Sequence, residues 1–261
     1  MNNSKDKPRW RIIPFEENDA YINMAADEAI FRCFPNHQIR TLRLYGWNPS
    51  AVSIGQHQKL NDEIDVSMVE KHNFQAVRRI SGGGAVFHYL KGELTYSVVT
   101  SIDYLDTKGI DESYYEIVGM IFEPLASFGV SINTDRIHCP SVFSNNKKIS
   151  GNAQARSGNT ILQHGTILID YDPNLMYSVL KARPSKTRSD MVASVYQKIT
   201  TISQQTQVKL TPRTLADHII EYVTAKDRTL FKTGSYFDDE IELTKKLISS
   251  KYKTKKWLHL R

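Results

Sequence analysis

The sequence predicts an α/β protein of the α+β type, in which a mixed, largely antiparallel sheet is flanked by helices. Two strand–turn–strand pairs support antiparallel pairing, because short glycine-containing turns join β-rich runs within residues 85–100 and 147–170. Apolar residues with helical spacing, for example at residues 112–128, supply the flanking helices. With 261 residues, 40% of them hydrophobic, the chain is long enough to bury a substantial core.

Composition limits the classes of function. The formal net charge of +6 admits acidic partners, but no recognised nucleic-acid-binding motif accompanies it, so we expect no nucleic acid partner. Two cysteines, Cys33 and Cys139, are too few for a disulfide framework and fit a reducing cytoplasm. The sequence has no apolar leader and no run of about 18 apolar residues, so we expect a cytoplasmic protein that does not enter a membrane.

We expect one domain and a short tail. Residues 1–9 are mostly polar and charged and are predicted to be disordered, whereas residues 10–261 contain no repeat and no low-complexity segment and are predicted to form a single domain.

Periodicity places the elements of the first third of the chain. It predicts a strand at residues 10–13 that Pro14 ends, a helix at 20–34 with Asp19 as its N-cap, strands at 41–45 and 51–54, a helix at 62–72 and a strand at 75–79. Cys33 is expected to be a small buried apolar residue. His57 lies in the loop that follows residue 54 and is a weaker candidate for a site role.

The same patterns continue to the end of the chain. They predict strands at 85–90 and 93–100, a helix at 112–128 between Asp111 as N-cap and Gly129 as C-cap, a strand at 130–133, an irregular connection at 134–146, strands at 147–156 and 160–170, a helix at 173–181, a basic, serine-rich loop at 182–190, a helix that Thr211 and Pro212 open and that ends near 226, and a helix at 238–250.

The most informative stretch is residues 78–99, which read as strand, glycine turn, strand, turn, strand. Gly82, Gly83 and Gly84 allow backbone conformations closed to other residues, and consecutive N–H groups beside Arg78 or Arg79 suit a bound carboxylate or phosphate. No Lys-Ser or Lys-Thr pair follows the glycines, and a strand rather than a helix comes next. Both facts exclude a Walker loop and a dinucleotide-binding fingerprint.

Residues 78–88, Arg-Arg-Ile-Ser-Gly-Gly-Gly-Ala-Val-Phe-His, resemble the signature loop of the lipoate–protein ligase A and octanoyltransferase family. Blocks at residues 44–55 and 147–168 resemble the same family, whereas the glycine loop of biotin ligases is absent. Tyr89 departs from the aspartate that family members usually carry after the histidine. The resemblance implies the biotin/lipoate ligase catalytic-domain fold, without the accessory domain that many ligases carry after it.

The resemblance also implies site residues. Lys148 matches the family's catalytic lysine, which holds acyl and phosphate oxygens. The implied substrate- or nucleotide-binding residues are Arg79, Ser81, Gly82, Gly83, Gly84, Ala85, His88, Ser150, Gly151, Asn152, Ala153 and His164. No metal ligand is identified.

The intact glycine loop favours an ATP-dependent lipoate–protein ligase. Such an enzyme activates lipoate or octanoate with ATP and Mg²⁺ as an acyl-adenylate. It then acylates a lysine of a lipoyl domain, such as that of a 2-oxoacid dehydrogenase E2 protein or a glycine-cleavage H-type protein. Ligases usually place Asn-Asp shortly before the lysine to help hold Mg²⁺, whereas residues 139–142 are Cys-Pro-Ser-Val and contain no acid.

Two alternatives remain open. In an ATP-independent octanoyltransferase, Cys139 would take octanoate from acyl carrier protein as a thioester, because a thiolate is a competent acyl acceptor. However, only nine residues separate Cys139 from Lys148, fewer than in the best-matching branch, and Cys139 is equally well explained as a thiol without a role. In the third interpretation the chain is a non-catalytic subunit of a two-chain ligase that needs a separate accessory-domain chain.

Overall fold

The computed structural model describes residues 10–106, 109–135, 141–182, 185–206, 208–227 and 230–261. The predicted tail at residues 1–9 therefore lies outside the described residues, as do Cys139 and part of the predicted connection at 134–146. The strands are β1 (Trp10–Asn18), β2 (Arg40–Trp47), β3 (Ala51–Ile54), β4 (Gln75–Arg78), β5 (Val86–His88), β6 (Glu93–Ser101), β7 (Asn133–Asp135), β8 (Ser141–Ser144), β9 (Lys147–Ser157), β10 (Thr160–Leu168) and β11 (Phe231–Thr233).

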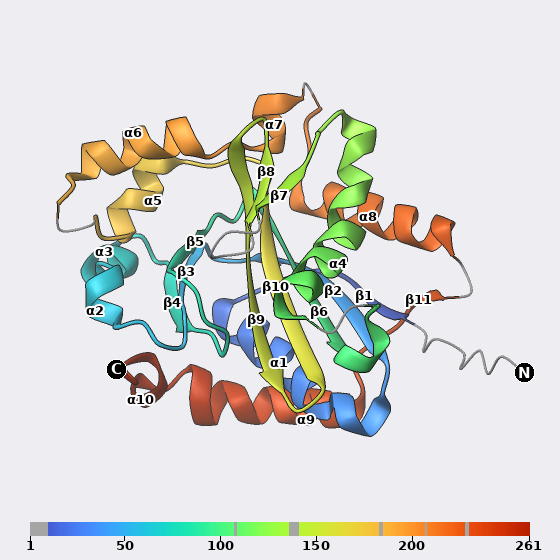
Figure 1. The fold of residues 1–261 in the computed structure, drawn as a ribbon. Coiled ribbons are helices and arrows are strands. Elements are labelled where there is room, and N and C mark those ends of the chain that lie inside the picture. The colour runs from blue at the N-terminus through green and yellow to red at the C-terminus, as the bar shows by residue number, and fades with distance from the viewer. Residues whose placement is uncertain (1–9, 107–108, 136–140, 183–184, 207, 228–229) are drawn as a thin grey trace, which may run out of the picture.

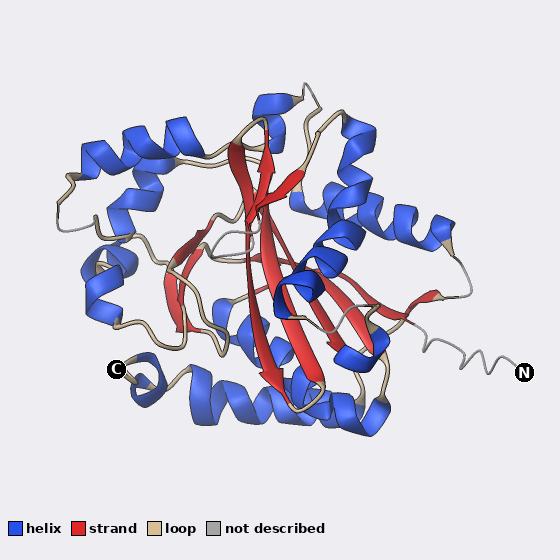
Figure 2. Ribbon diagram, in the orientation of Figure 1, coloured by secondary structure: helices blue, strands red, loops and turns tan. Residues whose placement is uncertain are grey.

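Helices surround these strands (Figure 2). The α-helices are α1 (Ala20–His37), α2 (Leu60–Glu63), α3 (Val66–Lys71), α4 (Ile110–Phe122), α5 (Pro173–Val179), α6 (Arg188–Lys198), α7 (Ile202–Gln205), α8 (Pro212–Lys226), α9 (Asp238–Leu247) and α10 (Lys255–Leu258), and the remaining helical turns are η1 (Ile102–Tyr104), η2 (Glu123–Phe128) and η3 (Ile248–Tyr252). None of the described helices is both long enough and apolar enough to cross a membrane.

The strands form two sheets (Figure 1). The larger has the order β11-β1-β2-β6-β10-β9-β8-β7, and the smaller has the order β4-β3-β5. In the larger sheet β1 is parallel to β2 and β11, and the remaining neighbours are antiparallel. In the smaller sheet β3 is parallel to β4 and antiparallel to β5. The predicted fold class, a mixed and largely antiparallel sheet flanked by helices, is confirmed.

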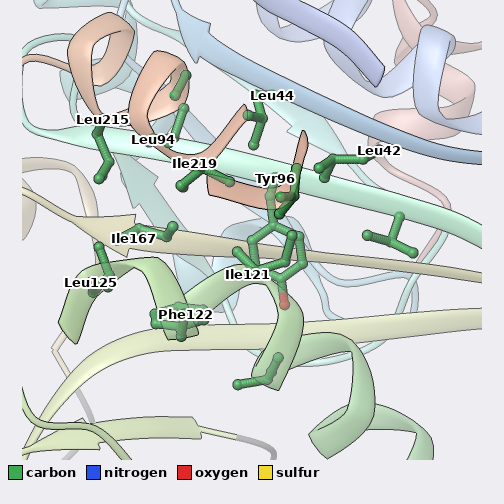
Figure 3. Close-up of a cluster of buried hydrophobic side chains, with 14 of the residues drawn as sticks. Leu42, Leu44, Leu94, Tyr96, Ile121, Phe122, Leu125, Ile167, Leu215 and Ile219 are labelled. Carbon is green, nitrogen blue, oxygen red and sulfur yellow. The ribbon is translucent and has the colours of Figure 1, made fainter. Parts of the chain in front are cut away.

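Alternate residues of the large sheet face two helical layers. On one face α4 and α8 pack on Leu42, Leu44 and Tyr96 (Figure 3). On the other face α1 packs on Val99 of β6 and Leu162 of β10, which are paired in register. The residues next to them in each strand point to the opposite face. Burial of each large apolar side chain contributes about 1.5–3 kcal/mol relative to leaving it exposed, so both layers hold the sheet firmly.

The outer edge of β1 is closed by the far end of the sequence. Trp10 pairs with Phe231 of β11, and their rings stack with centroids 5.7 Å apart. Arg11 donates to both carboxylate oxygens of Glu240 in α9, at 2.8 and 2.6 Å, and both side chains are buried. This bidentate ion pair joins residues that are 229 positions apart in the sequence.

The small sheet carries the glycine turn across the end of its central strand. Because β4 and β5 lie on either side of β3, residues 79–85 must pass over Gly55, which follows β3. A Cβ atom on Gly55 would lie 2.2 Å from the carbonyl oxygen of Gly83, so no other residue fits without moving the turn. Gly83 itself has a φ of 90°, which L-residues with side chains rarely adopt.

A buried cation joins this region to the end of the chain. The Arg78 guanidinium is fully buried and donates to the carbonyl oxygens of Gly55, Gln56 and Gln58 on one side. On the other side it donates to the carbonyl oxygens of Trp257 and Leu258. The loop after β3 and the C-terminal segment are therefore held by the same side chain.

Several predicted helix ends are confirmed. The Asp19 side chain accepts a hydrogen bond from the backbone N–H of Ile22 at 2.7 Å, as an N-cap does. Gly129 adopts a φ of 79° after η2 and acts as its C-cap. Thr211 caps α8 with Pro212 in the first turn. Cys33 is 6% exposed, as expected of a small buried residue.

Two predicted helices differ from the structure. The helix predicted at 62–72 is split into α2 and α3, because Asp65 is extended and its side chain caps α3 through the N–H of Met68. The helix predicted at 112–128 begins at Ile110 after Gly109, so Asp111 is not its N-cap. It changes to a 3₁₀-helix after Phe122, next to Pro124, which has no N–H to continue the α-helical pattern.

Strand predictions were wrong at several places. β1 continues past Pro14 because a register shift between Ile13 and Glu16 places the proline at a bulge, where no ladder hydrogen bond is needed. β7 begins at Asn133, and Val130 packs into the core instead of joining the predicted strand at 130–133. Residues 182–190 are not wholly loop, since Thr187 caps α6, which starts at Arg188. β8, β11 and α7 were not predicted.

We expect Gly55→Ala to lower the free energy of unfolding by about 1–3 kcal/mol, because the new methyl group must displace the backbone of the glycine turn. Urea unfolding measures the change. The matched control is Gly119→Ala, whose Cβ has open space inside α4 and should stabilise the protein by about 0.5–1 kcal/mol. Equal effects of the two substitutions would contradict the close approach at Gly55.

Candidate active site

A cavity of about 150 Å³ lies between the small sheet and strands β9 and β10 of the large sheet. Both sheets, the glycine turn and helix α1 contribute to its wall. It is lined by Met24, Tyr45, Trp47, Ser53, Arg79, Gly83, Gly84, Ala85, Val86, His88, Thr95, Lys148, Gly151, Asn152, Ala153, His164, Gly165 and Thr166.

Strand alternation decides which side chains reach this cavity. In β5, Val86 and His88 line it, whereas Phe87 between them packs with Val52 and Ile54 of β3 on the opposite side. In β9, Lys148 lines the cavity, whereas Ile149 enters the main core. The neighbouring Lys147 instead donates to the carbonyl oxygen of Tyr196 at 2.8 Å.

One buried histidine is held between a carboxylate and a hydroxyl. His164 Nδ1 lies 3.1 Å from Asp27 Oδ2, and its Nε2 lies 2.6 Å from Ser81 Oγ. Asp27 also accepts hydrogen bonds from Arg43 at 3.0 Å and from Tyr45 at 2.9 Å. Burial alone would raise the pKa of Asp27, but the His164 hydrogen bond and the Arg43 charge outweigh burial and hold that pKa below its usual value.

A second buried histidine has the same two kinds of partner. His88 Nδ1 lies 2.7 Å from Glu93 Oε1, and its Nε2 lies 2.8 Å from Ser53 Oγ. The Trp47 indole stacks on the imidazole, with ring centroids 3.8 Å apart and planes 14° apart. Thr95 links the two, since it accepts from Trp47 Nε1 and donates to Glu93 Oε1. These contacts at both ring nitrogens and on one ring face fix the orientation of His88.

Arg79 holds the glycine turn in place through hydrogen bonds. Its Nη2 donates to the carbonyl oxygens of Gly82 and Gly84, each at 2.7 Å, and its Nη1 donates to the backbone carbonyl and hydroxyl of Ser53. The guanidinium thus lies inside the turn and faces carbonyl oxygens, which fixes the shape of this wall of the cavity.

Residues 19–224, which include every described residue of this cavity, match the lipoyl protein ligase A/B catalytic domain. The chain belongs to this family. The resemblance seen at residues 44–55, 78–88 and 147–168 is confirmed, and the chain is an enzyme of the lipoate–protein ligase or octanoyltransferase type.

Curated relatives of the family extend over nearly the whole chain. The protein named octanoyltransferase LipM from Clostridioides difficile is 31% identical over 268 residues, covering 95% of this chain and 98% of the relative. The protein of the same name from Brevibacillus brevis is 30% identical over 275 residues and covers the same shares.

Solved structures share the fold. A bi-partite lipoate protein ligase from Thermoplasma acidophilum superposes with a TM-score of 0.82 and 25% identity, covering 97% of each chain. A lipoate-protein ligase A bound with ATP superposes with a TM-score of 0.81 at 23% identity, covering 96% of this chain and 98% of the other.

The structure gathers most residues that the family resemblance marked. Arg79, Gly83, Gly84, Ala85, His88, Lys148, Gly151, Asn152, Ala153 and His164 all line the cavity. Ser81, Gly82 and Ser150 do not line it, although Ser81 contacts His164 and Gly82 accepts from Arg79. Cys139 lies outside the described residues. The loop residue His57 is exposed and does not line the cavity.

The family motifs did not single out the residues behind the two histidines. Asp27 comes from α1 and Glu93 from β6, so only the folded chain brings each to its partner. Ser53 and Trp47 lie within residues 44–55, a block that the resemblance marked as a whole without indicating which of its side chains face the cavity. A usable signal was the polar Ser53 within the otherwise apolar strand Ala-Val-Ser-Ile.

The described lining offers no obvious place for a magnesium ion. Mg²⁺ prefers carboxylate and other hard oxygen ligands, and the lining residues named above include no aspartate or glutamate. Among the residues that the structure describes, no group of three or more His, Cys, Asp or Glu side chains could hold a metal ion. The lining residues named above therefore include no carboxylate that could hold Mg²⁺ beside a nucleotide.

We expect Asp27→Asn to lower the free energy of unfolding by about 3–5 kcal/mol at neutral pH, because buried Arg43 loses the nearer and more buried of its two carboxylate partners, Asp27 and Glu16. The folded-state pKa of Asp27 is lowered, so the stability that its charge contributes is present above the usual value of 3.8 and is lost as pH falls below it. The difference between wild type and variant should therefore shrink below about pH 4.

Urea unfolding between pH 7 and pH 3 measures that difference. Asp62→Asn is the matched control, since Asp62 is exposed on α2, and this substitution should change stability little at any pH. A constant difference for Asp27→Asn down to pH 3 would show that the side chain acts through shape rather than charge.

Proposed function

We propose that this protein is an ATP-independent octanoyltransferase that moves an octanoyl group from acyl carrier protein to a lysine of a lipoyl domain. The observation that carries the proposal is that relatives matching 95% of the chain are named octanoyltransferase LipM. The sequence alone favoured an ATP-dependent ligase because of the glycine loop, but the relatives support the octanoyltransferase alternative better.

The character of the cavity supports an acyl substrate. Met24, Tyr45 and Trp47 are each less than 5% exposed and give one part of the wall an apolar surface. Each methylene buried there contributes about 0.8 kcal/mol, so an eight-carbon chain gains several kcal/mol of binding free energy. Lys148, His88 and His164 supply polar groups for the reacting end of the substrate.

Chain connectivity supports Cys139 as the nucleophile. Ser141, two residues beyond Cys139, pairs with Gly151, which lines the cavity beside Lys148. Cys139 itself lies outside the described residues, so its assignment as nucleophile rests on its place in the sequence two residues before Ser141. A thiolate near a lysine ammonium is stabilised, which favours the reactive form.

The transfer proceeds in two halves. The Cys139 thiolate attacks the thioester carbonyl of octanoyl-acyl carrier protein, a new C–S bond forms, and the carrier leaves as a thiolate that takes up a proton. The lysine amine of the lipoyl domain then attacks the octanoyl-cysteine carbonyl, a C–N bond forms, the C–S bond breaks and the amine gives up a proton. The Lys148 ammonium stabilises the negative charge that develops on the carbonyl oxygen in both halves.

A specific observation keeps a second candidate function. The Thermoplasma acidophilum structure that is 25% identical, with a TM-score of 0.82, belongs to a bi-partite lipoate protein ligase that is described with its E2 lipoyl domain. This favours a lipoate ligase that uses lipoate or octanoate with Mg-ATP, either alone or with a separate accessory-domain chain. The acceptor proposed for either function is the lipoyl domain of an E2 or H-type protein.

We expect this protein to add one octanoyl group to a purified acceptor lipoyl domain when octanoyl-acyl carrier protein is supplied without nucleotide. Intact-mass spectrometry of the acceptor measures the product, and the enzyme itself should carry a hydroxylamine-sensitive octanoyl thioester. Cys139→Ser should abolish both, because its hydroxyl is a much weaker nucleophile. Cys33→Ala is the matched control and should keep activity, since Cys33 is buried in α1.

Other outcomes separate the alternatives. Labelling that requires lipoate or octanoate with Mg-ATP and survives Cys139→Ser would establish the ligase and overturn the octanoyltransferase. Labelling that appears only after a separate accessory-domain chain is added would support the two-chain interpretation.

We expect Lys148→Met to reduce the rate of octanoyl transfer by about 10²–10³-fold, because the cation that stabilises the developing oxyanion is lost. Lys147→Met should have little effect, because that lysine contacts the Tyr196 carbonyl instead of lining the cavity. Single-turnover rates with saturating octanoyl-acyl carrier protein measure both. Similar losses in the two variants would remove Lys148 from the mechanism.

A further inference from the structure

Two groups that can only donate fix the direction of the hydrogen bonds around His88. The indole N–H of Trp47 donates to Thr95 Oγ1 at 2.8 Å, so the Thr95 hydroxyl proton is free to donate to Glu93 Oε1 at 2.6 Å. At the other end, the Arg79 guanidinium donates to Ser53 Oγ at 3.1 Å. The polarity of the groups between these ends follows from these two constraints.

The Glu93 carboxylate sets the tautomer of His88. Its Oε1 accepts from Thr95 and lies 2.7 Å from His88 Nδ1, so Nδ1 carries the imidazole proton. Nε2 is then the acceptor nitrogen and receives the Ser53 hydroxyl proton at 2.8 Å. Glu93 is 1% exposed, and its second oxygen has no hydrogen-bond partner among the described residues, so the carboxylate is directed at this histidine.

Ser53 has one hydrogen-bonding position left. A hydroxyl group has one proton and two acceptor positions. The proton goes to His88 and one acceptor position receives Arg79, which leaves one acceptor position on Oγ. Ser53 lines the cavity, whereas the seryl partner of His164, Ser81, does not. Of these two serine partners of the described histidines, only Ser53 therefore lines the cavity in which a substrate would bind.

We propose that Ser53, His88 and Glu93 form a proton relay that removes the proton from the acceptor lysine amine during acyl transfer. Ser53 is the catalytic residue, because its Oγ accepts the amine proton. His88 receives the Ser53 proton at Nε2, and Glu93 is the positioning residue that holds Nδ1–H and stabilises the imidazolium. Arg79 stabilises the negative charge that passes through Ser53 Oγ.

The relay accounts for each proton that moves in the second half of the reaction. The amine nitrogen forms a bond to the acyl carbon as one of its protons moves to Ser53 Oγ and the Ser53 proton moves to His88 Nε2. The C–S bond to the enzyme then breaks, and the imidazolium returns its proton through Ser53 to the leaving thiolate. No oxidant, reductant or further co-reactant is consumed.

This inference rests on the proposed function only in that an activated acyl group must react with an amine. An octanoyl thioester and an acyl-adenylate both undergo that step, so the relay has the same task with either donor. The test therefore measures the aminolysis half-reaction separately from formation of the activated acyl group.

We expect Ser53→Ala to slow transfer from preformed octanoyl-enzyme to the lipoyl-domain lysine by about 10²-fold, while acyl-enzyme formation changes by less than about threefold. Hydroxylamine cleaves thioesters at neutral pH without help from a catalytic base, so it should react with the variant and wild-type acyl-enzymes at similar rates. The residual lysine reaction of the variant should rise with pH, because hydroxide replaces the missing base.

Three further variants complete the test. Ser53→Thr keeps a hydroxyl on a strand that tolerates β-branched residues, and should restore most of the rate. His88→Gln should lose aminolysis as Ser53→Ala does. Ser50→Ala is the matched control, because this buried hydroxyl accepts from the N–H of Leu90 and does not line the cavity. It should leave both half-reactions unchanged. Thermal unfolding of every variant identifies any loss of folded protein.

Each contrary result has a clear meaning. Equal slowing of both half-reactions by Ser53→Ala, or of the lysine and hydroxylamine reactions, would overturn the relay and leave a structural role. An unchanged rate in Ser53→Ala would overturn it while leaving the proposed function intact. If wild type forms no octanoyl-enzyme but transfers from acyl-adenylate, the proposed function fails and the same comparisons test the relay. Absence of transfer from both donors would overturn both.

Discussion

The cavity depends on the contact between the Arg79 guanidinium and the carbonyl oxygens of the glycine turn. Arg79 Nη2 donates to the carbonyl oxygens of Gly82 and Gly84, and Gly83 between them has a φ of 90°. With the cation in place, the turn is closed over the end of β3, and Ser53 is bound by the same guanidinium. One side chain thus determines both the shape of a wall and the position of a reactive hydroxyl.

Around this turn the buried histidines are hydrogen-bonded to other buried polar side chains. Each cavity histidine receives a carboxylate at Nδ1 and a hydroxyl at Nε2, although the two sets come from different elements. A buried carboxylate is costly unless it is hydrogen-bonded, so these arrangements persist only because the surrounding strands and α1 are held rigidly by the apolar layers. The core therefore supports the chemistry by fixing orientation, in addition to holding the protein folded.

Much of the site could be predicted from the sequence because it lies in short, continuous motifs. The glycine turn, His88 and Lys148 each sit within a block whose local strand pattern decides the side on which a residue lies. Asp27 and His164 are 137 positions apart, and no local pattern relates them, so their contact required the packing of α1 on β10. Ser53 was missed for a different reason, since its polarity marks it within the strand Ala-Val-Ser-Ile but does not show which partners it meets.

The same contrast between contacts of sequence neighbours and contacts of distant residues explains which elements of the fold could be predicted. The β9–β10 hairpin and the caps at Asp19, Thr211 and Gly129 depend on neighbours in sequence and were correctly placed. The split between α2 and α3 was missed because Asp65 favours a cap over helix continuation, a competition that apolar periodicity does not register. β11 has only three residues and is stabilised by a partner strand more than 200 positions away.

That distant pairing affects how the molecule is made. On the ribosome, β1 emerges more than 200 residues before β11 and Glu240, its partners in the folded protein. Until then the backbone groups along one edge of β1 are unpaired and the Arg11 guanidinium lacks its carboxylate. Such an edge can join another chain, and closing so long a loop is slow. The nascent protein therefore passes through a long interval in which its first strand needs protection from intermolecular pairing.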